Sequence, residues 1–237
     1  MNGAWAIALL LMQMQGTFRL PHEPPPERFG VVLIDRATNG TDTKAVSFSH
    51  ATHRVRYTCR VCHLELDFAF KRNTTEITEA ANRNKQFCGA CHDTSKDCEK
   101  CHVGEPKAES LTRFGDLPRA ARGNRVDWSA ALASGMIKPA ASLTKDFEPL
   151  TLDKTLSLEA EWTFVPPATF PHAEHVRWLD CANCHPDIFN VKKKTTPHFS
   201  MRFALAGQFC GVCHLNVAFP LHDCKRCHPT MENAPMQ

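Results

Sequence analysis

The stretch Cys59-Arg-Val-Cys62-His63 places two cysteines three positions apart and a histidine directly after them. The same C-x-x-C-H pattern returns five times along the 237-residue chain. The cysteine pairs are Cys59 and Cys62, Cys88 and Cys91, Cys98 and Cys101, Cys181 and Cys184, Cys210 and Cys213, and Cys224 and Cys227, followed by His63, His92, His102, His185, His214 and His228. The six pairs use all 12 cysteines, so one chemical role accounts for every cysteine.

Paired cysteines occur in disulfides, in zinc sites and in covalent haem attachment. Disulfides and zinc leave the histidines unexplained, because with 13 histidines in the chain six such coincidences have a chance probability of roughly 10⁻⁸. In covalent attachment, two thiols on one helical turn add to the two vinyl groups of a haem, and the next residue points its imidazole at the iron. The sequence therefore predicts six covalently bound haems (haem c), with the motif histidines as their first axial ligands.

The chain also contains a repeat with an offset of 122 residues. The matching stretches are Phe48-Ser-His50-Ala-Thr-His53 with Phe170-Pro-His172-Ala-Glu-His175, and Gln86–His92 with Gln208–His214. Only the third motif departs from the offset of 122, since Cys98 matches Cys224 at an offset of 126. We therefore expect two three-haem modules, at residues 28–103 and 161–230, joined by a connector at 104–160.

The sequence predicts little regular structure outside the motifs. Val31–Ile34 and Ala45–Phe48 flank an Asn39-Gly40 turn, which is typical of a β-hairpin. With about 40 residues per haem, the porphyrins must fill much of the core. We expect a mainly α and irregular, haem-cored fold with short helices at the motifs and an N-terminal hairpin.

The connector contains one clear helix signal. Asp127 is a good N-cap for a short helix over Trp128 to Ala133, and Gly135 is a good stop for it. We expect this connector to pack on the haem clusters.

The order of the motifs resembles a known family. F-x-H-x-x-H ahead of C-x-x-C-H, followed by F-C-G-x-C-H and a third C-x-x-C-H, is similar to the three-haem cytochrome c7 type, a relative of cytochrome c3, here doubled. The resemblance covers roughly residues 45–102 and 169–228. It implies two tandem cytochrome c7-like modules and electron transfer in the periplasm or outside the cell, in bacteria that respire with external or insoluble acceptors.

A low-spin electron-transfer haem needs a second axial ligand, usually His or Met. The H-x-x-H pairs recur at a fixed spacing before a haem motif in both modules, so they are the first candidates. Similarity to cytochrome c7 assigns the first histidine of each pair to the first haem of the module and the second histidine to the second haem. The implied pairs are His50 with His63, His53 with His92, His172 with His185, and His175 with His214.

The third haem of each module is less well determined. In the second module, His198 and Met201 are both candidates for the His228 haem, and we favour His198 because imidazole is the stronger ligand for ferric iron. The matching positions in the first module are Glu76 and Glu79.

The His102 haem must therefore take a ligand from elsewhere or remain open. The candidates are His22, which we favour, Met136 and His222.

The N-terminus indicates where in the cell the protein works. The apolar run Ala4–Met12 predicts an export signal within residues 1–20, although no Lys or Arg precedes Arg19.

The two propionates of each haem turn the formal charge of +3 into about −9 when all irons are ferrous. The basic residues then serve mainly as counter-charges, which removes the case for nucleic-acid binding.

These features predict an exported electron carrier with other redox proteins as partners, such as cytochromes and quinol-oxidising or outer-membrane complexes. One alternative is a multihaem reductase of a small oxyanion or nitrogen oxide at an open His102 haem. A motif with lysine in place of the histidine, usual for such a haem, does not occur in the sequence. Another is a subunit of a cytochrome filament or of a membrane-bound electron-transfer complex.

Overall fold

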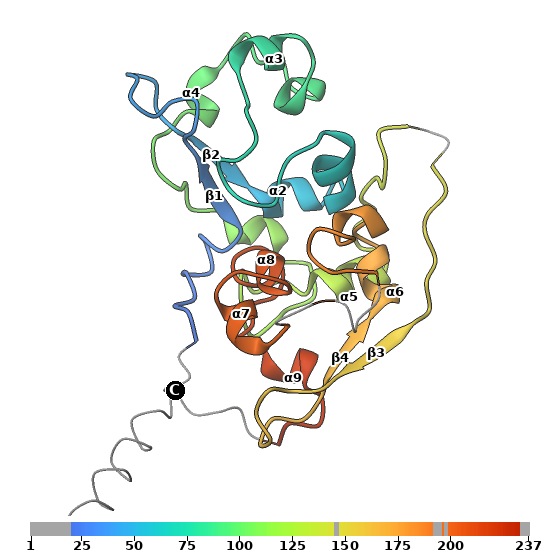
Figure 1. The fold of residues 1–237 in the computed structure, drawn as a ribbon. Helices are drawn as coiled ribbons and strands as arrows, with labels where there is room; N and C mark the ends of the chain where they lie inside the picture. The colour runs from blue at the N-terminus through green and yellow to red at the C-terminus, as the bar shows by residue number, and fades with distance from the viewer. Residues whose placement is uncertain (1–19, 145–146, 192–195, 197–198, 233–237) are drawn as a thin grey trace, which may run out of the picture.

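The computed structural model describes residues 20–144, 147–191, 196 and 199–232 (Figure 1). Its regular elements are short and are separated by long irregular segments. In the first module they are β1 (Val31–Ile34), β2 (Val46–Ser49), α2 (His50–Arg54), η1 (Val61–Glu65), α3 (Glu79–Arg83), η2 (Phe87–Ala90) and α4 (Cys98–Cys101). Those that follow are η3 (Leu111–Phe114), α5 (Trp128–Ala133), β3 (Thr155–Leu158), β4 (Ala168–Pro171), α6 (His172–Val176), η4 (Cys181–Asn183), α7 (Met201–Leu205), α8 (Gly211–His214) and α9 (Cys224–Cys227).

The predicted N-terminal hairpin is confirmed. β1 pairs antiparallel with β2, with Val31 opposite Ser49 and Ile34 opposite Val46. β2 leads directly into α2, whose N-cap Ser49 accepts a hydrogen bond from the backbone N–H of Thr52 at 3.2 Å. The hairpin therefore fixes where α2 begins.

A second hairpin, which was not predicted, opens the second module. β3 pairs antiparallel with β4, and β4 leads directly into α6. β3 lies in the range expected for the connector, so the hairpin crosses the boundary expected at residue 161.

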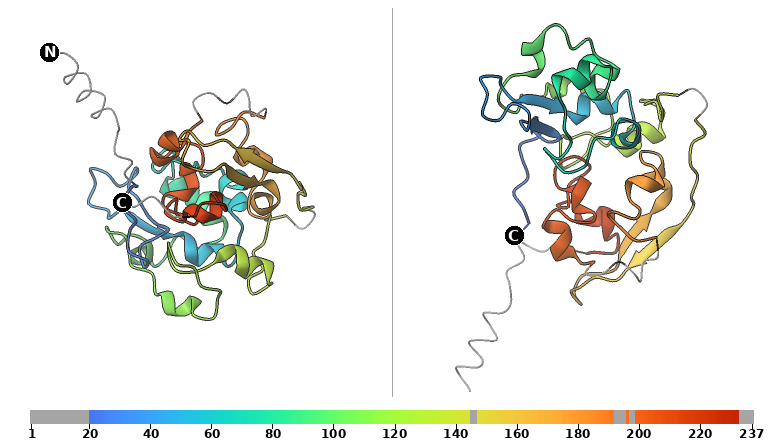
Figure 2. Two further views of the ribbon diagram at one scale, coloured as in Figure 1. Left: turned by 90° about the horizontal axis from the view of Figure 1, so that it is seen from below. Right: turned by 45° about the horizontal axis from the view of Figure 1, so that its top comes forward.

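The repeat seen in the sequence is also a repeat of structure. β2 and β4, α2 and α6, and α3 and α7 each start 122 residues apart. In both modules the third motif packs on the second strand of the hairpin, with α4 against β2 and α9 against β4. The molecule therefore contains two modules of the same plan, which lie against each other in both views of Figure 2.

The predicted connector helix is confirmed as α5. The Asp127 carboxylate accepts a hydrogen bond from the backbone N–H of Ala130 at 3.1 Å, and Gly135 follows with a φ of +72°. α5 and η3 supply Phe114, Trp128 and Ala131 to a hydrophobic cluster that also includes Ala51 of α2. This part of the connector therefore packs on the first module.

Direct contacts join the two modules near their first motifs. The Arg60 side chain donates from Nε to Asp180 at 3.1 Å, and the Asn183 side chain donates to the backbone oxygen of His63 at 3.2 Å. The backbone N–H of Arg60 donates to the backbone oxygen of Trp178 at 3.0 Å. The first motifs of the two modules are thus neighbours.

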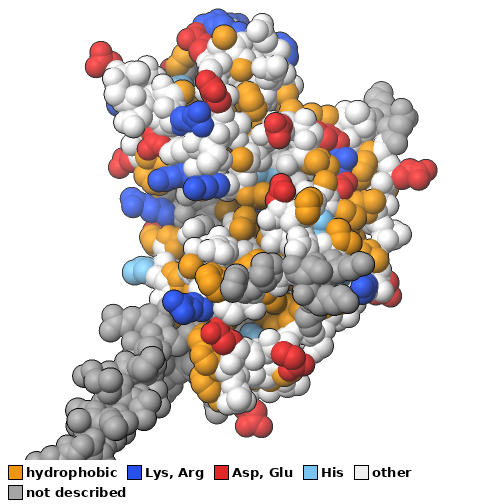
Figure 3. Space-filling model, viewed as in Figure 1, with side chains coloured by type: hydrophobic (Ala, Val, Ile, Leu, Met, Phe, Trp, Pro, Cys, Tyr) orange, Lys and Arg blue, Asp and Glu red, His pale blue; other side chains and the backbone are white. Residues whose placement is uncertain are grey.

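On the surface, hydrophobic side chains and histidines reach the face drawn in Figure 3, between scattered charged groups. None of the helices within the described ranges has the length and hydropathy to cross a membrane. The predicted export segment at residues 1–20 lies outside the described residues except for its last position.

Candidate haem sites

Each C-x-x-C-H motif lies on or beside a single helical turn. The turns are η1, η2, α4, η4, α8 and α9. None of the 12 cysteines forms a disulfide. In the described part of the chain, no group of three or more His, Cys, Asp and Glu side chains converges as a metal cluster would. The arrangement is therefore unlike that of a disulfide scaffold or a zinc site.

Most motif histidines are oriented by a hydrogen bond from the ring to the backbone. The Nδ1 atoms of His63, His102, His185, His214 and His228 contact the carbonyl oxygens of Phe68, Lys44, Phe189, Phe219 and Pro166, at 2.6 Å except for 2.8 Å at His214. A carbonyl can only accept, so Nδ1 carries the proton and Nε2 keeps a free lone pair. Nε2 is thereby prepared to bind a metal.

The four histidines of the H-x-x-H pairs are held in the same way. The Nδ1 atoms of His50, His53, His172 and His175 contact the carbonyl oxygens of Gly30, Ser49, Lys154 and Pro171 at 2.8 to 2.9 Å. Because Nδ1 carries the proton here as well, both rings of the facing pairs His50–His63 and His175–His214 present Nε2 as the ligand atom.

The phenylalanine of F-x-H-x-x-H separates the two histidines of each pair. Phe48 stacks on His53 with ring centres 4.4 Å apart and meets His50 edge-on at 4.9 Å. Phe170 stacks on His175 at 4.2 Å and meets His172 edge-on at 4.9 Å. One aromatic ring therefore contacts and orients two imidazoles. The phenylalanine is part of the sequence motif, but the pattern alone did not indicate this role.

Three of the four expected ligand pairs face each other. The ring centres of His50 and His63 lie 6.5 Å apart, those of His53 and His92 6.1 Å, and those of His175 and His214 6.3 Å. An iron bound between two imidazoles at about 2 Å per bond places their ring centres about 6 Å apart. The residues present therefore fit a bis-histidine iron. His172 and His185, both described, form no such ring contact.

Burial keeps these imidazoles in the form that binds a metal. It lowers the pKa of His50 to about 3 and that of His214 to about 4. It also lowers the pKa values of His53, His63 and His175. A neutral imidazole has the lone pair that iron requires, so near neutral pH no proton competes for these rings.

The glycine of F-C-G-x-C-H has a steric role. A Cβ atom on Gly89 would lie 1.8 Å from the backbone oxygen of Asn82, and one on Gly211 would lie 1.8 Å from that of Ala204. Any larger residue would push α3 or α7 away from the second motif. The motif therefore holds a helix against the second haem site in each module.

The third motifs lack a facing imidazole within the described ranges. The backbone oxygens of Lys44 and Pro166 orient His102 and His228, and these two residues are themselves 122 positions apart. His198, the favoured ligand of the His228 haem, lies outside the described residues, whereas Met201 begins α7.

No contact joins His102 to any of its three candidate ligands. His22 is exposed, and its neighbour Glu23 is anchored elsewhere, since its carboxylate accepts from the N–H of Gly123 at 2.5 Å. The His222 side chain is 8% exposed, and its Nδ1 atom lies 4.0 Å from the carboxylate of Glu23. Met136 is exposed. The segment before β1, which contains His22, runs away from α4 in Figures 1 and 2.

Comparison with known proteins places these sites in a family. The family described as "Cytochrome c7 and related cytochrome c" matches residues 46–114 and 168–229. The solved structure of the C-terminal hexahaem fragment of GSU1996 is 26% identical over 87% of this chain and 99% of that chain, with a TM-score of 0.28. The dodecahaem cytochrome c GSU1996 is 22% identical over 87% of this chain and 76% of that chain, with a TM-score of 0.32.

No curated protein matches the chain. The family match alone spans more than half of the chain and falls on the two modules that the repeat defines. The chain therefore belongs to the cytochrome c7 family and is a multihaem c-type cytochrome with two c7 regions.

Proposed function

We propose that the protein carries electrons outside the cytoplasm, in the periplasm or at the cell exterior, with six haems attached at its six motifs. Three facing histidine pairs, with ring centres 6.1 to 6.5 Å apart, are the observation that carries this proposal. Members of the cytochrome c7 family are typically electron-transfer proteins, and c-type cytochromes are exported.

The proposed ligand sets follow the repeat. His50 pairs with His63, His53 with His92, His172 with His185, and His175 with His214; His198 serves the His228 haem. His172 and His185 are included because they match His50 and His63 at an offset of 122. The 12 cysteines form the thioether links, two for each haem.

The bound haem supplies one-electron chemistry at its iron. At the pairs His50–His63 and His175–His214, the chain holds two neutral imidazoles facing each other, each fixed by a backbone carbonyl at Nδ1. Because neither the ligands nor their protons need to move when the charge changes, electron transfer requires little rearrangement. The partners are then other redox proteins, which dock where haem edges approach the surface.

The His102 site gives the enzyme alternative its only structural support. The two residues that replace His198 and Met201 are engaged with arginines: Glu76 lies 3.9 Å from Arg36, and Glu79 lies 2.6 Å from Arg83. Glutamate side chains supply neither an imidazole nor a thioether, so on this alternative a small oxyanion or nitrogen oxide binds at the His102 haem.

A potentiometric titration of the mature protein tests the carrier role. We expect six electrons per chain to be taken up and released reversibly, while added nitrite or another small oxyanion is not turned over by the reduced protein. An irreversible titration, or sustained oxyanion turnover, would favour the reductase instead.

A further inference from the structure

The contact between η1 and η4 joins the first haem motifs of the two modules. Among the described helices and strands, no other pair from the two modules has as extensive a contact. The backbone N–H of Arg60 donates to the backbone oxygen of Trp178 at 3.0 Å, and the Asn183 side chain donates from Nδ2 to the backbone oxygen of His63 at 3.2 Å. Arg60 and Asn183 each lie between the two cysteines of their own motif. The two C-x-x-C-H turns therefore bond to each other directly.

Asn183 closes a ring of hydrogen bonds across this boundary. Its Oδ1 atom accepts from the backbone N–H of Asp180 at 2.7 Å, and the Asp180 carboxylate accepts from Nε of Arg60 at 3.1 Å. The ring returns to Asn183 through its bond to His63, three residues after Arg60. Asn183 is 4% exposed, so both ends of its buried amide are satisfied and its position is fixed.

The repeat does not account for the residues of this contact. Asn183 aligns with Val61, which has no polar side-chain atom, and Trp178 aligns with the exposed Arg56. Trp178 instead packs against the hydrophobic cluster that includes Ala51 of the first module. A residue that served only its own haem motif would be expected in both modules, so Asn183 and Trp178 serve the boundary.

The connector fixes η1 in place for this contact. The backbone N–H of Thr58 donates to the backbone oxygen of Ala140 at 3.0 Å, and Nη1 of Arg60 donates to that of Ala141 at 3.2 Å. The first motif of the first module is therefore bonded both to the connector and to η4.

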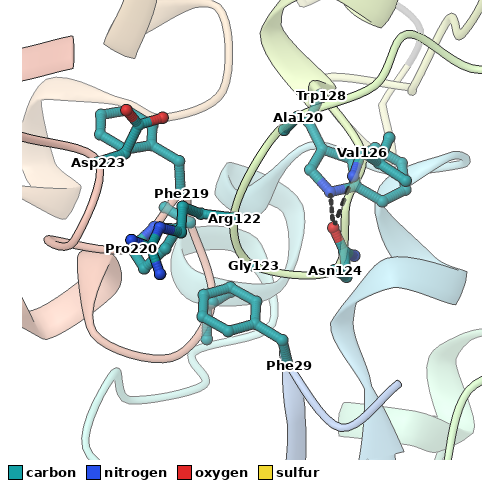
Figure 4. Close-up of a pocket in the computed structure, with 12 residues that line it drawn as sticks. Phe29, Ala120, Arg122, Gly123, Asn124, Val126, Trp128, Phe219, Pro220 and Asp223 are labelled. Carbon is teal, nitrogen blue, oxygen red and sulfur yellow. Dashed lines mark hydrogen bonds between the residues drawn. The ribbon is translucent and has the colours of Figure 1, made fainter. Parts of the chain in front are cut away.

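The second module also touches the N-terminal segment, the connector and α2, but through residues outside the haem motifs. Phe29, Gly123 and Pro220 line a small cavity, and none of the described residues around it belongs to a motif (Figure 4). Arg54 of α2 donates to the backbone oxygen of Val217 at 3.0 Å, and Val217 lies after its motif. Among these described contacts, only that of η1 with η4 joins two motif turns.

Covalent attachment turns this contact into a contact between haems. The thioether bonds form at the vinyl groups, so the edge of each porphyrin that carries them lies against its own motif turn. Two motif turns that bond directly therefore bring two such edges close together. In addition, His63 is an axial ligand and accepts from Asn183, so one hydrogen bond links the covalent network of one haem to that of the other.

We propose that electrons pass between the modules at the His63 and His185 haems, and that Asn183 is the positioning residue for this crossing. The inference rests on the proposed carrier function. An electron that crosses oxidises one ferrous iron and reduces the neighbouring ferric iron, and no bond is made or broken. Because neighbouring charges interact strongly where little water lies between them, the oxidation state of one of these haems shifts the potential of the other.

Haem-by-haem redox titration followed by NMR tests the crossing in the mature protein. In the wild type, the midpoint of the His63 haem should shift more with the oxidation state of the His185 haem than with that of any other haem of the second module. A larger shift caused by the His214 or the His228 haem overturns the proposal. A wild type that does not titrate reversibly contradicts the carrier function itself.

Asn183→Leu tests the positioning role, because leucine has about the same volume and no polar side-chain atom. The interaction between the His63 and His185 haems should fall roughly two- to fourfold, since water that enters the loosened contact raises the effective dielectric constant from about 20 towards 80. All six haems should stay attached. An interaction of wild-type size in this variant overturns the role of Asn183.

Asn82→Leu is the matched control, because it makes the same change at an asparagine that bonds a motif of its own module. The Asn82 side chain accepts from the backbone N–H of Gly89 at 3.4 Å. The interaction between the His63 and His185 haems should keep its wild-type size in this variant. An equal fall in Asn82→Leu and Asn183→Leu would mean that the bond across the boundary is not the cause, and would overturn the role of Asn183.

Discussion

Replacing Arg60 with methionine removes the central cation of the contact between the first motifs. The Arg60 guanidinium binds Asp180 at 3.1 Å and the backbone oxygen of Ala141 at 3.2 Å, contacts Glu65, and lies 4.1 Å from the ring centre of Phe147. The three charged side chains are 14% to 20% exposed, so water screens them little. Methionine keeps most of the packing on Phe147 and loses the charge.

The cost of this change can be estimated from the bonds that are lost. A hydrogen bond to a charged group contributes about 1.5–3 kcal/mol. Glu65 keeps bonds from Ser142 and Leu143 at 2.6 and 2.7 Å, and Asp180 keeps a bond from the N–H of Ala182 at 3.2 Å, so neither carboxylate is left without a partner. We therefore expect a loss of about 3 kcal/mol, at the lower end of the range for breaking a buried pair. For a chain of this length that corresponds to a fall in Tm of roughly 6–12 °C.

Differential scanning calorimetry of the mature protein measures the effect. Arg83→Met is the matched control, because Arg83 and Glu79 form an ion pair that is 55% and 75% exposed, and its loss should cost less than about 1 kcal/mol. Equal Tm values for Arg60→Met and the wild type, or equal losses in the two variants, would refute the idea that this network holds the modules together.

Three further predictions concern the ligands and the pH. His175→Ala should turn one haem in six high-spin in the oxidised protein, because His175 faces His214 at 6.3 Å; an unchanged electron paramagnetic resonance spectrum would make His175 a structural residue. The His102 haem should be the spectroscopic outlier of the six: carbon monoxide added to the reduced protein binds at this haem if its iron is open, whereas no binding, with one haem turned high-spin in His22→Ala, establishes His22 as its ligand; six equivalent bis-histidine signals that survive both His22→Ala and His222→Ala would contradict the prediction. Burial raises the pKa of Glu65, but the bonds from Ser142, Leu143 and Arg60 outweigh this and leave the pKa below its ordinary 4.5. The stabilisation by Glu65 is then complete above about pH 4.5 and is lost as the pH falls through the lower folded pKa, so Tm should fall less steeply with acid in Glu65→Gln; parallel Tm curves would contradict this.

Much of the site could be predicted because covalent attachment fixes residue types and spacing. C-x-x-C-H is a chemical requirement, so it marks the haem positions whatever the surrounding fold is. The helix at Trp128 and the hairpin at Val31 were predictable for a similar reason: the Asp127 cap and the Asn39-Gly40 turn act on neighbouring residues.

The second hairpin could not be recognised in the same way. Thr155-Leu-Ser-Leu158 lacks the β-branched run of Val31–Ile34, and it lies 124 rather than 122 residues after that strand, so the repeat does not point to it. Tertiary pairing with β4, and not local propensity, makes it a strand.

The contacts between the modules are equally hidden in the sequence. Arg54 and Arg60 align with Val176 and Ala182, so the repeat gives no sign of their roles. Arg54 binds Val217 and Arg60 binds Asp180, each more than 100 residues away in the chain, and only folding brings these pairs together. The ligand of the His102 haem is not determined for the same reason, because no local motif supplies it.

The central claim is that every one of the six motifs holds a haem through two thioether bonds. Intact mass spectrometry of denatured protein, from a host with full maturation machinery and combined with thiol titration, tests it most directly. The account predicts the mass of the chain plus six haems and no reactive thiol, since all 12 cysteines are used. A mass with five haems or fewer, or free thiols in the mature chain, would contradict it.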